Sequence, residues 1–324
     1  MKILSLAFML LGTFIGAGFV SGREIARYFS IYGIYSYFGI VISIISLALL
    51  MIFFFSLSHK VNGFSGFINV YFGKCNKVVS WLFSISLIIF SGTMMAGCGE
   101  ISTNIHINNY AIILLTIILC FVVVMKSTRG LSLFNLILLP LLLVFLISVT
   151  FSKNIFVYDI HFQGAFLFDS IFYVFINIVT LGIFIIEIGN KYTKKECVLS
   201  VVISIFVIFG VILIVNNAIQ LNGLQYNSMP ILYLSKLKGT VVNIIMTIFV
   251  WIGLFSTLAS NVYVLKSILP INVSDNLKCF IVLILSVVLG FVKFDIFVNY
   301  IYLIIGFIGI LLVILTLNGK KELK

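Results

Sequence analysis

Long apolar stretches separated by short polar connections occupy almost the whole chain. A helix that crosses a membrane needs roughly 20 mostly apolar residues, and the stretches have about that length. The ten expected helices cover residues 3–20, 33–58, 78–103, 109–125, 131–151, 169–190, 197–219, 240–268, 279–292 and 297–317. The pattern therefore predicts an all-α integral membrane protein.

The first apolar stretch is interrupted by glycines in its middle. Its segment GTFIGAGFVSGREI, from Gly12 to Ile25, carries four glycines and ends in charge. Glycine weakens a helix, and freed backbone groups at membrane depth are tolerated only where protein or a water-filled cavity satisfies them. The break therefore indicates a binding site, although the small-xxx-small spacing of these glycines also fits close helix packing.

Composition agrees with a membrane protein and disfavours an enzyme. The chain is 62% hydrophobic and 9% charged, with a mean hydropathy of +1.29, whereas soluble proteins are about 25% charged. It has no H-E-x-x-H zinc motif and no G-x-S-x-G nucleophile elbow, and we expect no cofactor. The opening MKILSLAFMLLG also has features of a signal peptide, an alternative that the nine following spans disfavour.

The distribution of basic residues predicts the orientation. With the amino terminus inside, fourteen of the 20 Lys and Arg residues fall on the cytoplasmic side and six outside, which is the bias expected of a multi-pass protein. We therefore expect a cell (plasma) membrane protein with both termini in the cytoplasm. Anionic lipid head groups account for the net charge of +11, so the bilayer is a partner and nucleic acid is not.

A cut after residue 151 divides the ten expected helices into two sets of five. Because five is odd, the second set enters the membrane from the opposite side, as inverted repeats require. We expect a first five-helix repeat at 1–151, an external loop at 152–168, a second inverted repeat at 169–318 and a cytoplasmic tail at 319–324.

The sixth stretch matches the first. It reads NIVTLGIFIIEIG from Asn177 to Gly189, a polar run that contains glycine and ends in a glutamate. We expect both helices to be broken, the first around residues 16–18 and the sixth around residues 180–182.

The segment IGAGFVSGREI and the following YFSIYG, from Ile15 to Gly33, resemble the YkvI-like membrane proteins of bacteria. That family is a branch of the amino acid-polyamine-organocation superfamily, which shares the five-plus-five inverted repeat of the leucine transporter. The resemblance implies a secondary active transporter of a small amine, amino acid or related solute, coupled to sodium or protons. It also implies a sodium site between the break in the first helix and the eighth expected helix, residues 240–268. The residues of that site are Gly12, Ile15, Ser256, Thr257 and Ser260.

We expect the substrate between the two breaks near the midplane. Half-helix ends there present N–H groups to a carboxylate and carbonyls to an ammonium, which suits a small zwitterion or amine. The candidate residues are Gly16, Ala17, Gly18, Ser91, Thr93, Asn177, Thr180 and Gly182. For the hydroxyl and amide side chains, ordinary bonding to their own backbone or to neighbouring helices is the alternative.

Charged residues at span ends suggest gates. Arg23 and Glu24 are expected at the outer mouth, with Glu100 or Asp295 as a partner of Arg23, and a solvated cluster is the alternative. At the inner end, Glu187 is expected either to pair with Lys2 or a loop lysine or to carry a proton.

A different class of function keeps the same pocket. A ligand-sensing membrane subunit, similar to that of a spore germinant receptor, would bind a solute without moving it and would depend on protein partners. The hydroxyls on the eighth expected helix, residues 240–268, and the charges at the outer mouth favour transport.

Overall fold

Nearly all of the described chain is helical. The computed structural model describes residues 2–104, 107–125, 127–151 and 164–319. Its elements, in chain order, are α1 (Lys2–Phe14), α2 (Ala17–Val20), α3 (Arg23–Tyr28), η1 (Ser30–Tyr32), α4 (Tyr35–Ser58), α5 (Gly63–Phe72), η2 (Gly73–Cys75), α6 (Asn76–Asn104), α7 (Asn109–Met125), α8 (Ser127–Thr150), α9 (Ala165–Ile188), η3 (Gly189–Lys191), α10 (Lys194–Leu221), α11 (Pro230–Leu237), α12 (Thr240–Ile268), α13 (Asp275–Leu289), α14 (Phe294–Ile296), the π-helical turn η4 (Phe297–Ile301) and α15 (Tyr302–Gly319).

The longer helices lie where the apolar stretches predicted them, whereas α3, α5 and α11 lie in segments that were expected to be connections. In the described part of the chain, six are long and apolar enough to cross a membrane, and Lys2–Phe14, Asn109–Met125 and Asn135–Thr150 are shorter apolar helices. α9 begins at Ala165, inside the expected loop 152–168; residues 152–163 of that loop and 320–324 of the expected tail lie outside the described residues. The count of ten spans and the two inverted repeats stay predictions.

The first helix is broken, as its glycines predicted. α1 ends at Phe14, α2 begins at Ala17, and a second interruption at Gly22 separates α2 from α3. Gly22 has φ of 81°, a left-handed conformation that glycine adopts without steric cost. After the second interruption, α3 packs against α9, α10 and η4.

The sixth helix is not broken, and that prediction is wrong. α9 runs without interruption over Ala165–Ile188. Its polar groups bond within the helix: the Asn177 amide donates to a carbonyl one turn earlier at 2.9 Å, and the Thr180 hydroxyl donates to the Asn177 carbonyl at 3.0 Å. A Cβ on Gly182 would lie 3.3 Å from the Phe54 ring. The glycine therefore lets α4 approach closely and does not interrupt the helix.

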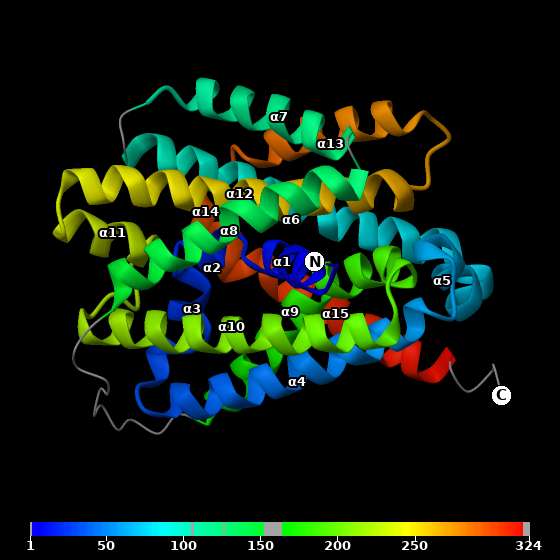
Figure 1. Cartoon of the computed structure of the whole chain (residues 1–324), viewed down its shortest axis with the longest axis horizontal. Helices are drawn as coiled ribbons and strands as arrows, with labels where there is room; N and C mark the ends of the chain where they lie inside the picture. Colours follow the sequence, from blue (N-terminus) through cyan, green and yellow to red (C-terminus); the bar gives the residue numbers. More distant parts are fainter. Residues whose placement is uncertain (1, 105–106, 126, 152–163, 320–324) are drawn as a thin grey trace.

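α9 lies at the centre of the bundle. Of its most apolar 18 residues, 83% are buried, and it packs against α4, α15 and α1. α10 lies beside α4 along one edge of the molecule and α7 beside α13 along the opposite edge, while α5 and α11 cover opposite ends (Figure 1). The broken first helix passes between α9, α10 and α12, so its interruption is enclosed by protein.

Candidate functional site

Oxygen atoms from two distant segments converge at the first break. The Thr257 hydroxyl on α12 donates to the carbonyls of Gly12 and Ile15, at 3.0 Å each, and the Ser256 hydroxyl donates to the Gly12 carbonyl at 3.1 Å. Both hydroxyls are buried. The structure thus brings together four of the five residues expected at a sodium site.

The fifth expected residue, Ser260, lies apart from this cluster. Its hydroxyl donates to the Ser256 carbonyl one turn earlier on α12, at 3.0 Å. Serine in a membrane helix commonly bonds its own backbone in this way. Within the described chain its hydroxyl makes no hydrogen bond to the break.

Asn135 on α8 joins the cluster, and the sequence analysis missed it. Its side-chain oxygen accepts a hydrogen bond from the Ser256 hydroxyl at 2.7 Å, and its buried amide nitrogen has no hydrogen-bond partner within the described chain. A Cβ on Gly12 would collide with this amide and with the Ser256 hydroxyl, so any larger residue there would have to displace them. A lone amide inside an apolar stretch was the signal that would have found Asn135.

A second group of polar side chains surrounds the short helices α2 and α3. Glu24 is 5% exposed and lies under Gly18, where a Cβ would collide with its carboxylate. The Tyr302 hydroxyl lies beside this carboxylate and beside Thr93 of α6, and the Tyr173 hydroxyl lies beside Asn177 of α9. Thr93 and Asn177 were expected at a substrate site, whereas the tyrosines were missed.

Neither tyrosine hydroxyl makes a hydrogen bond of good geometry to the described chain, although both are buried and lie near these polar neighbours. Most buried hydroxyls in proteins are bonded. Aromatic rings enclose the group: Tyr173 lies 5.7 Å from Tyr28 and 5.0 Å from Phe29 between ring centroids, and Phe90 lies 5.2 Å from Tyr302. The π-helical turn Phe297–Ile301 directly precedes Tyr302, and such turns are frequent at functional sites.

The other expected substrate residues divide between the break and ordinary packing. A Cβ on Gly16 would lie 3.2 Å from Met94 of α6 and 3.6 Å from Thr257, so Gly16 is at the break. The Ser91 hydroxyl donates to a carbonyl of its own helix at 2.8 Å, as Thr180 does. Gly182 faces α4, and the side chain of Ala17 lies outside what the structure describes.

Arg23 is held at the end of the molecule that carries α11. Its Nε lies 3.2 Å from a carboxylate oxygen of Asp295, and its other nitrogens donate to the Asn227 carbonyl at 3.2 Å and to the Asn299 side chain at 3.3 Å. The Ile231 amide, on α11, donates to the Ser21 carbonyl at 3.0 Å. Arg23 therefore ties α3 to the segment before α11 and to η4.

Two other acidic residues expected at the outer mouth form no ion pair with Arg23 in the described chain. Glu24 turns inward to Tyr302, because consecutive residues of the helix α3 point in different directions. Glu100 lines a cavity of about 250 Å³ together with Asn104, Asn227 and Lys236. Of the two expected partners of Arg23, the structure places Asp295 in contact.

A second ion pair was not expected. A guanidinium nitrogen of Arg27 lies 2.6 Å from a carboxylate oxygen of Asp169, which also accepts a hydrogen bond from the Tyr32 hydroxyl at 2.6 Å. The pair joins α3 to the first turns of α9. Its signal in the sequence was an acidic residue at the start of one span and a basic residue just beyond another.

Glu187 contacts the start of α5, which was not expected. Its carboxylate accepts a hydrogen bond from the Phe64 amide at 3.0 Å, at the start of α5. Gly63, with φ of 68°, lets the chain turn into that helix, and its Cβ would lie 3.2 Å from the same carboxylate. Glu187 thus caps the amino terminus of α5, where a negative charge is favourable, and the ion pairs of the described chain do not include it.

Comparison with known proteins gives a fold and a partial relative. No protein-family profile matches the chain. Over 155 residues, 47% of this chain, it is 29% identical to a protein of Bacillus subtilis (strain 168) named uncharacterized membrane protein YkvI, and the match spans 45% of that protein's length.

Solved transporters share the fold at low sequence identity. The inward-facing conformation of Mhp1 aligns with a TM-score of 0.66 and 12% identity over 94% of this chain and 72% of that one. MhsT in complex with L-phenylalanine aligns at 0.65 and 16%, over 94% and 87%. A Na+-coupled sialic acid symporter aligns at 0.59 and 14%, over 92% and 73%. The chain therefore has the fold of these membrane transporters.

Proposed function

We propose that this chain is a secondary active transporter that moves a small amine or amino acid across the membrane by alternating access, coupled to sodium. The observation that carries the proposal is the contact of the Thr257 hydroxyl with both carbonyls at the break. Irregular backbone that meets hydroxyls at membrane depth is how transporters with discontinuous helices hold a coupling ion.

The proposed ion ligands are the carbonyls of Gly12 and Ile15 and the hydroxyls of Ser256 and Thr257. All four are neutral oxygens, which suit a small hard cation without placing a carboxylate beside it. A bound cation would take the place of the hydrogen bonds that the hydroxyls now donate to the carbonyls. Because Asn135 accepts the Ser256 proton at 2.7 Å, that hydroxyl would turn its lone pairs toward the ion while it keeps this bond.

We place the substrate beside Glu24, Tyr173 and Tyr302. The ion pairs that the structure shows in the described chain join Arg23 to Asp295 and Arg27 to Asp169, which leaves the Glu24 carboxylate outside them. A buried carboxylate is costly unless it meets a cation or a proton. The ammonium group of an amine or amino acid is such a cation.

The tyrosines complete this assignment. Their hydroxyls make no hydrogen bond of good geometry to the described chain and can accept from or donate to a polar ligand, and aromatic rings attract an ammonium through their faces. The second break expected at Gly182 is absent, so no half-helix amino terminus on α9 binds a substrate carboxylate. A simple amine therefore fits these residues at least as well as a zwitterion.

Alternating access requires that each end closes in turn. At the α11 end, the contacts of Arg23 and Ser21 close the path to Glu24. At the α5 end, α1 is joined to α10 by the Ser200 hydroxyl, which donates to the Ile3 carbonyl at 2.8 Å, and by the Ser204 hydroxyl, which donates to the Ala7 carbonyl at 3.1 Å. We propose these two sets of contacts as the outer and inner seals.

The test is uptake of amines and amino acids into proteoliposomes that contain the purified chain. Candidate solutes are first selected by their effect on thermal unfolding, since a ligand that binds only the folded state raises the unfolding temperature. We expect an inward sodium gradient to drive accumulation. Glu24→Gln should lower uptake of a cationic solute about tenfold or more, because hydrogen bonds to charged groups contribute about 1.5–3 kcal/mol.

Asp275→Asn is the matched control, because Asp275 is an exposed acid at the start of α13. This variant should transport the solute at the wild-type rate. Binding without movement under any gradient would contradict transport and favour the ligand-sensing alternative. Accumulation that follows a proton gradient and ignores sodium would contradict the ion assignment alone.

A further inference from the structure

A cavity of about 270 Å³ lies between α4 and α10, apart from the broken helix. Its apolar wall is formed by Ile52 and Phe55 of α4 and by Val198 of α10. Ile52 and Val198 are 38% and 43% exposed, so on a bundle in a membrane they face the hydrocarbon. The cavity therefore offers a surface to an apolar chain.

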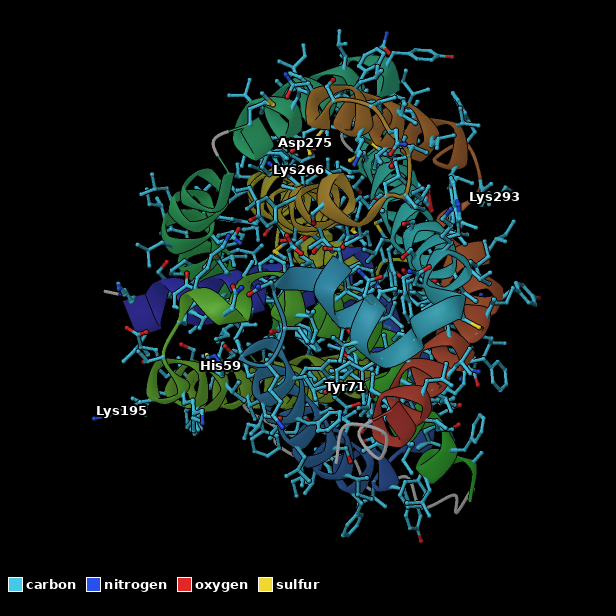
Figure 2. All side chains as sticks on the ribbon, turned by 90° about the vertical axis from the view of Figure 1, so that its right-hand side faces the viewer. His59, Tyr71, Lys195, Lys266, Asp275 and Lys293 are labelled. Atoms are coloured by element: carbon cyan, nitrogen blue, oxygen red, sulfur yellow. The ribbon has the colours of Figure 1, made fainter. Side chains whose placement is uncertain are left out.

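The rim of the same cavity is basic. His59 and Lys60 follow the last residue of α4, and Lys194 is the first residue of α10. Figure 2 looks onto this end of the molecule, where His59 lies between the ends of α4 and α10. The ion pairs shown in the described chain involve neither lysine, so both are available to an anion.

The acidic residue that follows Lys194 most closely in the sequence is not part of the cavity wall. Glu196, two residues after Lys194, accepts a hydrogen bond from the Thr193 amide at 2.8 Å as part of the capping box of α10. It does not line the cavity. The His59 ring is occupied on one side, where its Nε2 lies 3.9 Å from the sulfur of Cys197, so the lysines supply most of the charge.

We propose that this cavity binds an anionic phospholipid of the cytoplasmic leaflet. Its phosphate would lie between Lys60 and Lys194, and one acyl chain would follow Ile52 and Val198. Basic pockets between membrane helices on the cytoplasmic side are suited to anionic head groups. A water-soluble anion would leave the apolar wall uncovered, and a neutral lipid would leave the lysines without a partner, so an anionic lipid alone uses both halves of the site.

The position of the cavity beside α10 would let a bound lipid affect the contact between α10 and α1. α10 is also the helix that binds α1 through Ser200 and Ser204. A lipid that contacts both α4 and α10 would hold α10 in position, and α10 carries the two serines of the proposed inner seal.

The experiment measures thermal unfolding of the delipidated full chain in detergent, titrated with phosphatidylglycerol, phosphatidylcholine or inorganic phosphate. We expect phosphatidylglycerol to raise the unfolding temperature at the lowest concentration. In Lys60→Gln/Lys194→Gln, its apparent affinity should fall about 25-fold, since each near-surface basic residue contributes about fivefold.

Lys195→Gln is the matched control. Lys195 is exposed, follows Lys194 directly and projects away from the molecule at its margin (Figure 2), so its loss should leave the affinity within about twofold of wild type. Equal effects of the two lipids, an equal loss in Lys195→Gln, or unchanged affinity in the double variant would overturn the proposal. A matching effect of phosphate alone would overturn it in favour of a free-anion site.

Discussion

The hydroxyl oxygen of Thr257 lies 3.0 Å from the carbonyl oxygen of Ile15, although 242 residues of sequence separate them. The contact joins the middle of α12 to the interruption of the first helix. Carbonyls at a helix end lack partners in their own helix, and in a membrane they must be satisfied by protein, water or an ion. A single side chain thus meets the backbone groups that the break sets free.

Replacing Thr257 by Ala removes this hydroxyl, and we expect the stabilisation of the chain by sodium to weaken. The affinity for sodium, measured from the dependence of the unfolding temperature on its concentration, should fall about 10- to 100-fold, as expected for loss of a contact of about 1.5–3 kcal/mol with a charged group. Thr257→Ser should recover most of it.

Ser260→Ala is the control for that variant, because among the described residues the Ser260 hydroxyl bonds the carbonyl of Ser256 and not the break. An equal loss of sodium affinity in Ser260→Ala, or an unchanged affinity in Thr257→Ala, would contradict the assigned ligands.

Gly12→Ala should be destabilising and should also weaken the sodium response. The added Cβ would collide with the Asn135 amide and the Ser256 hydroxyl, and overpacking of this kind costs about 1–3 kcal/mol. Gly210→Ala in α10 is the matched variant, because nothing lies within 4 Å of a Cβ there. It should keep the sodium response and raise stability by about 0.5–1 kcal/mol. Thermal unfolding with and without sodium measures both, and similar behaviour of the two alanines would argue against a tight cluster at Gly12.

Arg23→Ala should open the outer seal. We expect a cysteine placed at Ser21, which is fully buried, to react about fivefold faster with a membrane-impermeant reagent added outside, because a partly exposed ion pair contributes up to about 1 kcal/mol. The measurement uses a background in which the exposed Cys75 is serine.

Asp295→Asn should have the same effect on Ser21→Cys labelling, whereas Lys293→Gln, an exposed neighbour of Asp295, should have none. An unchanged labelling rate in Arg23→Ala would remove Arg23 from the account of gating.

Glu187→Ala should loosen the start of α5. The lost acceptor for the Phe64 amide is the equivalent of a missing helix cap and costs about 1 kcal/mol. Hydrogen exchange should become faster by about fivefold at Phe64 and the residues just after it, and stay unchanged in α11 at the opposite end. Glu187→Gln keeps an acceptor oxygen, so its exchange rate at Phe64 should lie between that of the wild type and that of Glu187→Ala. Protection of α5 that does not change in the alanine variant would exclude the capping role.

Several parts of the fold could be predicted from the sequence because they depend on local composition. Apolar length predicted where the longer helices lie, and the glycines from Gly12 to Gly22 predicted the break in the first helix. The same reasoning was wrong for α9, where Gly182 has the composition of a break but accommodates the Phe54 ring of α4. Whether a glycine interrupts a helix or makes room for a neighbouring helix depends on which side chain packs against it. The tertiary structure decides that packing.

The sequence by itself determined that this is a membrane bundle with an interrupted first helix, since hydropathy and glycine content act within a single segment. Only the tertiary structure decided which polar side chains meet. In the structure, Asn135 lies beside Ser256 and Glu187 lies at the amino terminus of α5. Glu24 faces inward to Tyr302, whereas its neighbour Arg23 contacts Asp295. A buried polar group must find a partner, but the partner it finds depends on how helices far apart in sequence cross and rotate against one another.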